Sequence, residues 1–459
     1  MTSDSVPSDL NAMPQEPCDA RNADSEADEA GLSDLDHALA DWAFRHGADE
    51  LVACGFAIAN WAVTQGHTCL ALNAIPRNLM RAQMQRALPA ALAASLLAGG
   101  PGSRRPLIVE DGMLYLQRYH AYETQLAERL RQLLAAPPEL VDVARLQRGH
   151  GLFDVETEAH DGTNWQAVAA FVALRHRFSV ISGGPGTGKT YIIVRLLRVL
   201  IESALAGDRP PPRIALAAPT GKAAARMVDG MRGGLEAMAA EPTSSSLITQ
   251  HIPTVAMTLH RLLGLTGSTT KPRYHADNPV PADVVIVDEA SMVDLPLMAK
   301  LAAAVRADGR LILLGDRYQL ASVESGSVLA GICSNAGVNS FTKEQQNAAG
   351  GLIEQAAEPN PDILGDHVVT LQTSRRFNAD SNIGRLARAV NAGDAVTVHD
   401  LLSAGHADLI YRNGAGGAAI ERLMDEQTEH YDSLRQATDP ALAVAQLAKC
   451  CILTAVRNG

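Results

Sequence analysis

The chain has 459 residues, of which 47% are hydrophobic and 20% charged, and its formal net charge is −12. This composition is that of a globular protein with about two to four domains. It contains no apolar run of about 18 uncharged residues and no basic, then apolar, leader at its start, so it predicts neither a membrane span nor secretion. The negative charge argues against a broadly basic surface for nucleic acid, although a local basic track remains compatible with it.

The six cysteines are scattered and form no C-x-x-C pair. Such spacing argues against a zinc site and against a disulfide scaffold. The sequence therefore predicts a protein of a reducing compartment, the cytoplasm.

The first 150 residues predict an acidic tail followed by a mainly helical domain. Residues 1–33 are rich in Ser, Asp, Glu and Pro and poor in large apolar residues, which is typical of a disordered segment. Residues 34–148 contain apolar residues at helical spacing, for example over Leu51–Val63. The turn dipeptide Asp111-Gly112 separates two short apolar runs and predicts a hairpin. A long amphipathic helix is expected to begin near Arg118.

The next segment carries the strongest motif of the chain, G-x-x-x-x-G-K-T at 183–190, in the sequence ISGGPGTGKTY. A β-branched apolar run precedes it, and an apolar pattern of helical period follows it, which is the strand–loop–helix context of a phosphate-binding loop. Glycines let successive backbone N–H groups point at phosphate oxygens, and the helix N-terminus favours the same anion. The predicted nucleotide-binding residues are Gly183, Gly184, Pro185, Gly186, Thr187, Gly188, Lys189 and Thr190.

Individual side chains in and before this loop have predicted roles. Lys189 would reach the β- and γ-phosphates, and the Thr190 hydroxyl would hold Mg²⁺. Gln166, upstream of the loop, has an amide suited to the adenine edge, but an exposed glutamine at a helix start is an equal alternative.

A second buried strand is expected at 213–218, running into Pro219-Thr-Gly-Lys. A helix that starts with Thr220 and Lys222 suits a phosphate, here of a nucleic-acid backbone. By itself this signal is weak.

Two further strands carry polar residues at their ends. Val284–Val287 leads into Asp288 and Glu289, and a strand over 310–314 leads into a turn containing Gln319. Open parallel sheets place ligand chemistry at the C-terminal ends of their strands. Asp288 would bind Mg²⁺ through water, Glu289 would polarise the attacking water, and Gln319 would sense the γ-phosphate. The order of these elements predicts an α/β fold with a parallel sheet and a nucleotide-hydrolysing core.

Residues 342–366 are polar and contain Gly and Pro, which predicts a loop or linker, and a strand is expected at 368–371. Arg376 follows this strand and would either reach a γ-phosphate across a domain interface or lie on the surface. A helix is expected from Ser381 to Asn391, and one more strand at 451–454. Boundaries are placed at 148/149 and 365/366.

Taken together, the motifs resemble those of superfamily 1 DNA helicases of the 5′-to-3′ branch, and more narrowly of the RecD family, the alpha subunits of exodeoxyribonuclease V. The motifs that carry the resemblance are LYLQRYHAYE at 115–124, WQAVAAF at 165–171, GGPGTGKT at 183–190, APTGKAAARM at 218–227, TLHRLLG at 258–264, VDEASMVD at 287–294, GDRYQL at 315–320 and SRRF at 374–377.

The resemblance implies a RecA-like motor domain over residues 149–365 and the start of a second one over 366–459, behind an N-terminal domain that contacts a RecC-like subunit. It implies ATP and Mg²⁺ as ligands, single-stranded and double-stranded DNA ends as substrate, and a RecB-like subunit that carries the nuclease. The family roles would fall on Lys189, Asp288, Glu289, Gln319 and, as the trans arginine, Arg376. Thr220 and Lys222 match the segment that the family uses near DNA.

The sequence departs from the family pattern at its end. The sequence up to Gly459 lacks the later motifs of the second motor domain, so ATP binding is better supported than unwinding. An assembly subunit that holds nucleotide without productive turnover is therefore an alternative to a DNA motor. A P-loop phosphotransferase is a third, disfavoured because the Asp-Glu pair and Gly-Asp-x-x-Gln suit attack by water.

Overall fold

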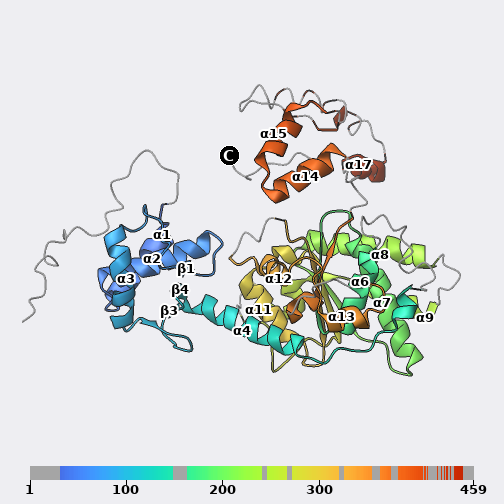
Figure 1. Ribbon diagram of the computed structural model, residues 1–459, viewed down its shortest axis with the longest axis horizontal. Coiled ribbons are helices and arrows are strands. Elements are labelled where there is room, and N and C mark those ends of the chain that lie inside the picture. The colour runs from blue at the N-terminus through green and yellow to red at the C-terminus, as the bar shows by residue number, and fades with distance from the viewer. Residues whose placement is uncertain are drawn as a thin grey trace, which may run out of the picture. The chain divides into compact units, whose positions relative to one another are not determined.

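The computed structural model describes most of the chain (Figure 1). The described residues are 31–147, 163–239, 246–265, 271–319, 325–353, 362–373, 381–406, 408–409, 411, 421, 425, 428, 431–432, 435 and 439–447. The predicted tail, Arg376 and the strand at 451–454 lie wholly or almost wholly outside them. The chain divides into two compact units, Met1–Arg376 and Phe377–Gly459.

The N-terminal part of the first unit packs three helices against a small sheet. The helices are α1 (Asp34–Arg45), α2 (Glu50–Thr64) and α3 (Ala82–Ala94). The sheet has the order β1-β4-β3-β2, with strands β1 (Leu70–Ala71), β2 (Ala98–Gly99), β3 (Leu107–Glu110) and β4 (Met113–Leu116). Ser33 caps α1 through a reciprocal pair of hydrogen bonds with Asp36. The predicted hairpin is confirmed, with Asp111 and Gly112 both at positive φ in its turn.

Helix α4 (Gln117–Leu134) leads from the hairpin to the large sheet and packs along α11 (Leu295–Ala304). Its start agrees with the long helix expected near Arg118. Helix α5 (Val143–Gln147) follows, and it contacts α6 (Trp165–Arg175).

The rest of the first unit is built on a six-stranded parallel sheet with the order β10-β5-β9-β8-β6-β7. The strands are β5 (Phe178–Gly183), β6 (Ile214–Ala218), β7 (Met257–Thr258), β8 (Val284–Val287), β9 (Arg310–Gly315) and β10 (Val368–Leu371). Strands β5, β8, β9 and β10 are buried along their whole length, as the apolar runs predict for a sheet covered on both faces. The predicted α/β fold with a parallel sheet is confirmed.

Helices lie on both faces of this sheet (Figure 1). Besides α6 and α11 they are α7 (Lys189–Ala206), α8 (Gly221–Ala239), α9 (Ser246–Thr249), α10 (Leu259–Leu263), α12 (Val328–Ala336) and α13 (Lys343–Ala348), with short 3₁₀ turns η2 (Ala290–Met292) and η3 (Ile363–His367). Separate apolar clusters fill the two faces, one under α6 and α7 and the other under α4 and α11.

Two predictions about the end of this unit need correction. The segment 342–366 is not only a loop, because it contains α13 and most of η3. Strand β10 pairs with β5, Val368 opposite Val180, so it belongs to the first sheet and the unit extends past the predicted boundary at 365 to Arg376. The predicted N-terminal domain, residues 34–148, belongs to the same compact unit, Met1–Arg376.

The described part of the second unit is helical. It contains α14 (Asn382–Ala392), α15 (Ala395–Ser403) and α17 (Pro440–Leu447). Ser381 caps α14, and Gly393 ends it in the left-handed region, close to the predicted bounds. Within the described residues, no helix is both long and apolar enough to cross a membrane.

Candidate nucleotide-binding and hydrolysis site

The loop between β5 and α7 has the backbone that the glycine motif predicts. Gly186 and Gly188 have φ of +79° and +88°, in the left-handed region that side chains with a β-carbon rarely adopt. Gly188 is the N-cap of α7, and no side chain accepts a hydrogen bond from the first N–H groups of this helix. An uncapped helix N-terminus beside a glycine turn suits an anion.

Lys189 lies inside this loop. Its Nζ donates hydrogen bonds to the Gly183 carbonyl and, at 3.2 Å, to the Gly184 carbonyl. The Thr187 hydroxyl also donates to the Gly184 carbonyl, at 2.9 Å. The ammonium group is thus held over the loop, where a phosphate would replace neutral carbonyls as its partner. Pro185 is the one exposed residue of the motif.

Gln166 is the second residue of α6 and is buried, with 8% of its surface exposed. Its Nε2 donates to the Thr187 carbonyl at 3.0 Å, which fixes the side chain against the loop. Its Oε1 is buried and has no hydrogen-bond partner. The predicted alternative of an exposed helix-start glutamine is therefore wrong. A buried acceptor without a partner costs free energy unless a donor reaches it, and an exocyclic amino group is such a donor.

The two acids lie at the end of β8, separated from β5 only by β9. Asp288 accepts a hydrogen bond from the Glu289 N–H at 2.8 Å. Glu289 has φ of +53°, an unusual backbone for a residue with a β-carbon. Such strain costs about 1–3 kcal/mol and concentrates at functional sites.

Burial raises the pKa of Asp288, and the neighbouring Glu289 charge adds to the rise. The Glu289 backbone N–H and the Lys189 ammonium oppose it. The loop lysine is therefore near enough to the first acid for its charge to act on that carboxyl group. Carboxylate oxygens are ligands that Mg²⁺ prefers, and a divalent cation there would offset the desolvation of the Asp288 carboxylate.

Gln319 follows β9, the strand between the loop and the acids. Its Oε1 accepts a hydrogen bond from the Ser291 hydroxyl at 2.6 Å, and its N–H donates to the Asp316 carbonyl. Ser291 lies two residues after Glu289, so it connects the predicted sensor to the acids. Sequence reasoning gave Ser291 no role, although the sequence DEAS contains it.

Thr190 and the predicted DNA-contacting residues lie around α8. The Thr190 side chain is half-buried and packs near Gly230, where an added β-carbon would lie 2.7 Å from its Cγ2. The Thr220 hydroxyl accepts the Ala223 N–H at 3.2 Å and so caps α8, while Lys222 is exposed on the first turn.

A cavity of about 460 Å³ lies beside α8. It is lined by Gly221, Ala224, Ala225, Val228, Asp229, Arg261 and residues 254–258, and by none of residues 183–190. It is therefore separate from the nucleotide loop.

Two family models match the chain. The model described as "AAA domain" matches residues 165–325, and the model described as "RecBCD enzyme subunit RecD, N-terminal domain" matches residues 28–115. RecBCD enzyme subunit RecD of Mycolicibacterium smegmatis is 36% identical over 423 residues, which are 90% of this chain and 67% of that protein. The chain belongs to the RecD family.

Other relatives match over shorter stretches. RecBCD enzyme subunit RecD of Haemophilus influenzae is 37% identical over 287 residues, 61% of this chain and 44% of that protein. The ATP-dependent RecD2 DNA helicase of Deinococcus radiodurans is 30% identical over 324 residues, 68% of this chain and 40% of that protein. This RecD-family chain spans about two thirds of the length of its mycobacterial relatives, with 65% for Mycobacterium tuberculosis.

Proposed function

We propose that this RecD-family chain is the ATP-dependent, 5′-to-3′ DNA helicase subunit of a RecBCD-type exodeoxyribonuclease V, acting on DNA ends in double-strand break repair and recombination. Its partners would be RecB-like and RecC-like subunits in the cytoplasm. The observation that carries the proposal is the position of Lys189, Asp288 and Gln319 at the C-terminal ends of three neighbouring strands.

The loop binds the nucleotide. Backbone N–H groups of the loop residues other than Pro185, which has none, and of the start of α7 receive the phosphates, and Lys189 transfers its hydrogen bonds from carbonyls to phosphate oxygens. The partnerless Oε1 of Gln166 accepts from the adenine amino group, which gives preference for ATP over nucleotides lacking that donor.

Asp288 and Glu289 perform different tasks. Asp288, together with the Thr190 hydroxyl, would hold Mg²⁺, which would supply positive charge against the phosphates of the nucleotide. Glu289, whose backbone is in the left-handed region, accepts a proton from the attacking water. Gln319, oriented by Ser291, reports whether the γ-phosphate is present.

DNA contact and the trans arginine complete the proposal. Thr220 and Lys222 lie at the exposed start of α8, where a backbone phosphate of single-stranded DNA can approach. Arg376 lies outside the described residues and is proposed on its match to the family motif alone.

The test is steady-state ATP hydrolysis by the chain and by its complex with the partner subunits, with and without single-stranded DNA. We expect DNA-stimulated turnover that Glu289→Gln lowers by about 10²–10⁴-fold while nucleotide binding is retained. Binding without any turnover, in the chain and in the complex, would instead favour the assembly subunit. Turnover that Glu289→Gln leaves unchanged would refute the assignment of the base.

A further inference from the structure

The N-terminal region contacts the motor next to the hydrolysis site. Ser325, which is 3% exposed, donates from its hydroxyl to the Val63 carbonyl at 2.9 Å, near the end of α2. The N–H of the next residue, Gly326, donates to the Gly66 carbonyl at 3.0 Å. These two hydrogen bonds join residues more than 250 positions apart in the chain.

The fit around Gly326 is close. Its φ is +100°, and a β-carbon there would lie 2.8 Å from the Leu295 Cβ and 3.2 Å from the Thr68 Cγ2. Leu295 begins α11, and the Thr68 hydroxyl donates to Glu123 of α4 at 3.2 Å. Only glycine therefore lets the N-terminal region and α11 approach each other at this point.

Residues 291–295 of the motor form hydrogen bonds with both Gln319 and Ser325. Ser291 donates to Gln319, and the Leu295 N–H donates to the Ser325 carbonyl at 3.2 Å. Residues 291–295 follow Asp288 and Glu289 after one intervening residue, Ala290. Hydrogen bonds thus link the predicted sensor and the end of α2 to residues 291–295, which the chain itself joins to the two acids.

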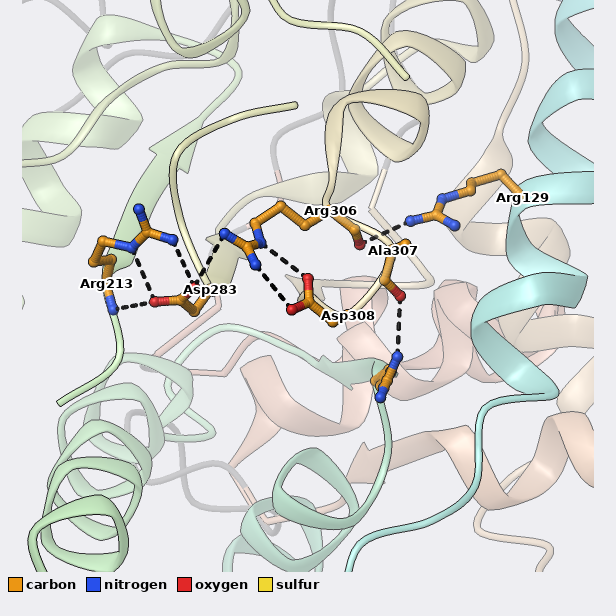
Figure 2. A network of polar contacts seen from close by, with 7 residues as sticks. Arg129, Arg213, Asp283, Arg306, Ala307 and Asp308 are labelled. Carbon is orange, nitrogen blue, oxygen red and sulfur yellow. Dashed lines mark hydrogen bonds and ion pairs between the residues drawn. The ribbon is translucent and has the colours of Figure 1, made fainter. Parts of the chain in front are cut away.

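The N-terminal region also holds the other end of α11. Arg129 of α4 donates to the carbonyls of Ala302, Val305 and Arg306 at 3.2, 2.9 and 2.9 Å. Figure 2 shows Arg129 beside Arg306, whose guanidinium pairs with Asp308 and Asp283. A guanidinium at a helix C-terminus satisfies carbonyls that have no partner within the helix. The part of the chain that precedes the motor therefore holds the C-terminal end of α11 directly, through Arg129, and its start indirectly, through Ser325 and Gly326.

We propose that Ser325 and Gly326 are positioning residues that couple the N-terminal region to Asp288, Glu289 and Gln319. The inference rests on the proposed ATPase function of that site. Through this contact, a partner subunit bound to the N-terminal region alters the geometry of the acids, and nucleotide at the loop alters the end of α2 in return. Coupling between two sites is reciprocal, so either direction can be measured.

The experiment is amide hydrogen exchange of the full chain, wild type and Ser325→Ala, first without nucleotide and then with Mg²⁺ and a non-hydrolysable ATP analogue. Ser33→Ala is the matched control, because it removes a serine hydroxyl bond within the N-terminal region, at the α1 cap, and leaves the motor contact intact. Gly326→Ala is a second variant, which opens the same contact by steric overlap. Circular dichroism checks that each variant is folded.

Without nucleotide, Ser325→Ala is expected to raise exchange about fivefold at residues 63–68 and at 291–295, as for one lost hydrogen bond. Ser33→Ala leaves both segments unchanged. With the analogue, protection at 63–68 rises in wild type and in Ser33→Ala but not in Ser325→Ala or Gly326→Ala. A merely structural serine would alter overall stability without removing this response to nucleotide.

Unchanged exchange at 291–295 in Ser325→Ala, or an equal nucleotide response in all variants, would overturn the coupling. Failure of the wild type to bind the analogue would refute the proposed function, and the measurement without nucleotide would still decide the coupling.

Discussion

Gly188→Ala tests whether the loop has the conformation described here. The φ of +88° costs an alanine roughly 1–2 kcal/mol. Its β-carbon would lie 2.4 Å from the Gln166 Nε2, so this buried amide must shift, and loss of its bond to the Thr187 carbonyl would cost about 1 kcal/mol. Together these effects destabilise the first unit, Met1–Arg376, by roughly 2–3 kcal/mol, which corresponds to a fall in melting temperature of about 3–4 °C for a unit of this size.

Gly184→Ala is the matched control in the same loop. The nearest atom to its added β-carbon is the Asp316 Oδ2 at 3.9 Å, so the substitution is expected to leave the melting temperature within about 1 °C of wild type. The assay is thermal unfolding of each full-length variant in the absence of nucleotide. Equal melting temperatures for the two variants would refute the conformation assigned to the loop and to Gln166.

Three other predictions concern charged and titratable groups. Because burial raises the pKa of Asp288, the folded state binds its proton more tightly than the unfolded state, and stability falls as pH rises through the ordinary carboxyl range. Asp288→Asn should therefore raise the melting temperature at pH 7 and lose that advantage towards pH 4, and a gain that is independent of pH would contradict this. Burial first, and the nearby His367 second, lower the pKa of His176 to about 3. The neutral imidazole therefore contributes stability to the fold above pH 6.5, and this contribution is lost as pH falls towards 3, by up to about 1.4 kcal/mol per pH unit. Urea unfolding from pH 7 to 5 should show a shallower decline for His176→Gln, and parallel declines would show that another group titrates. Arg129→Ala removes three hydrogen bonds to the end of α11 and should destabilise the first unit by about 2 kcal/mol. Arg131→Ala, on the exposed side of α4, should change the stability of this unit by less than about 0.5 kcal/mol. Equal effects of the two substitutions in thermal unfolding would count against the α11 contact.

The backbone of the candidate nucleotide site was largely predictable because its signals are local. Glycines at fixed spacing, a preceding apolar run and two acids after a β-branched run each reflect backbone geometry within a few residues. Their meeting follows from the rule that parallel strands place their C-terminal ends at one edge. The burial of Gln166 was not predictable, since it depends on Gly188, which lies 22 positions away in the sequence.

The segment 342–366 was predicted to be a loop because the side chains that it buries include polar ones. Gln345 and Gln346 of α13 are 1% and 4% exposed, and Gln345 bonds to His176, Arg175 and the Asp366 carbonyl. Hydrophobic periodicity cannot detect a helix that a polar network holds in place. The contacts of Ser325 with α2 likewise join distant parts of the chain and have no local pattern.

Equilibrium binding of a fluorescent ATP analogue with Mg²⁺, to wild type and to Lys189→Ala, tests the central claim most directly. Loss of one charge-assisted contact to phosphate should weaken binding about tenfold to a hundredfold, while Lys343→Ala, at an exposed lysine of α13, should bind as wild type does. Equal affinity in Lys189→Ala and wild type would contradict the assignment of residues 183–190 as the nucleotide site.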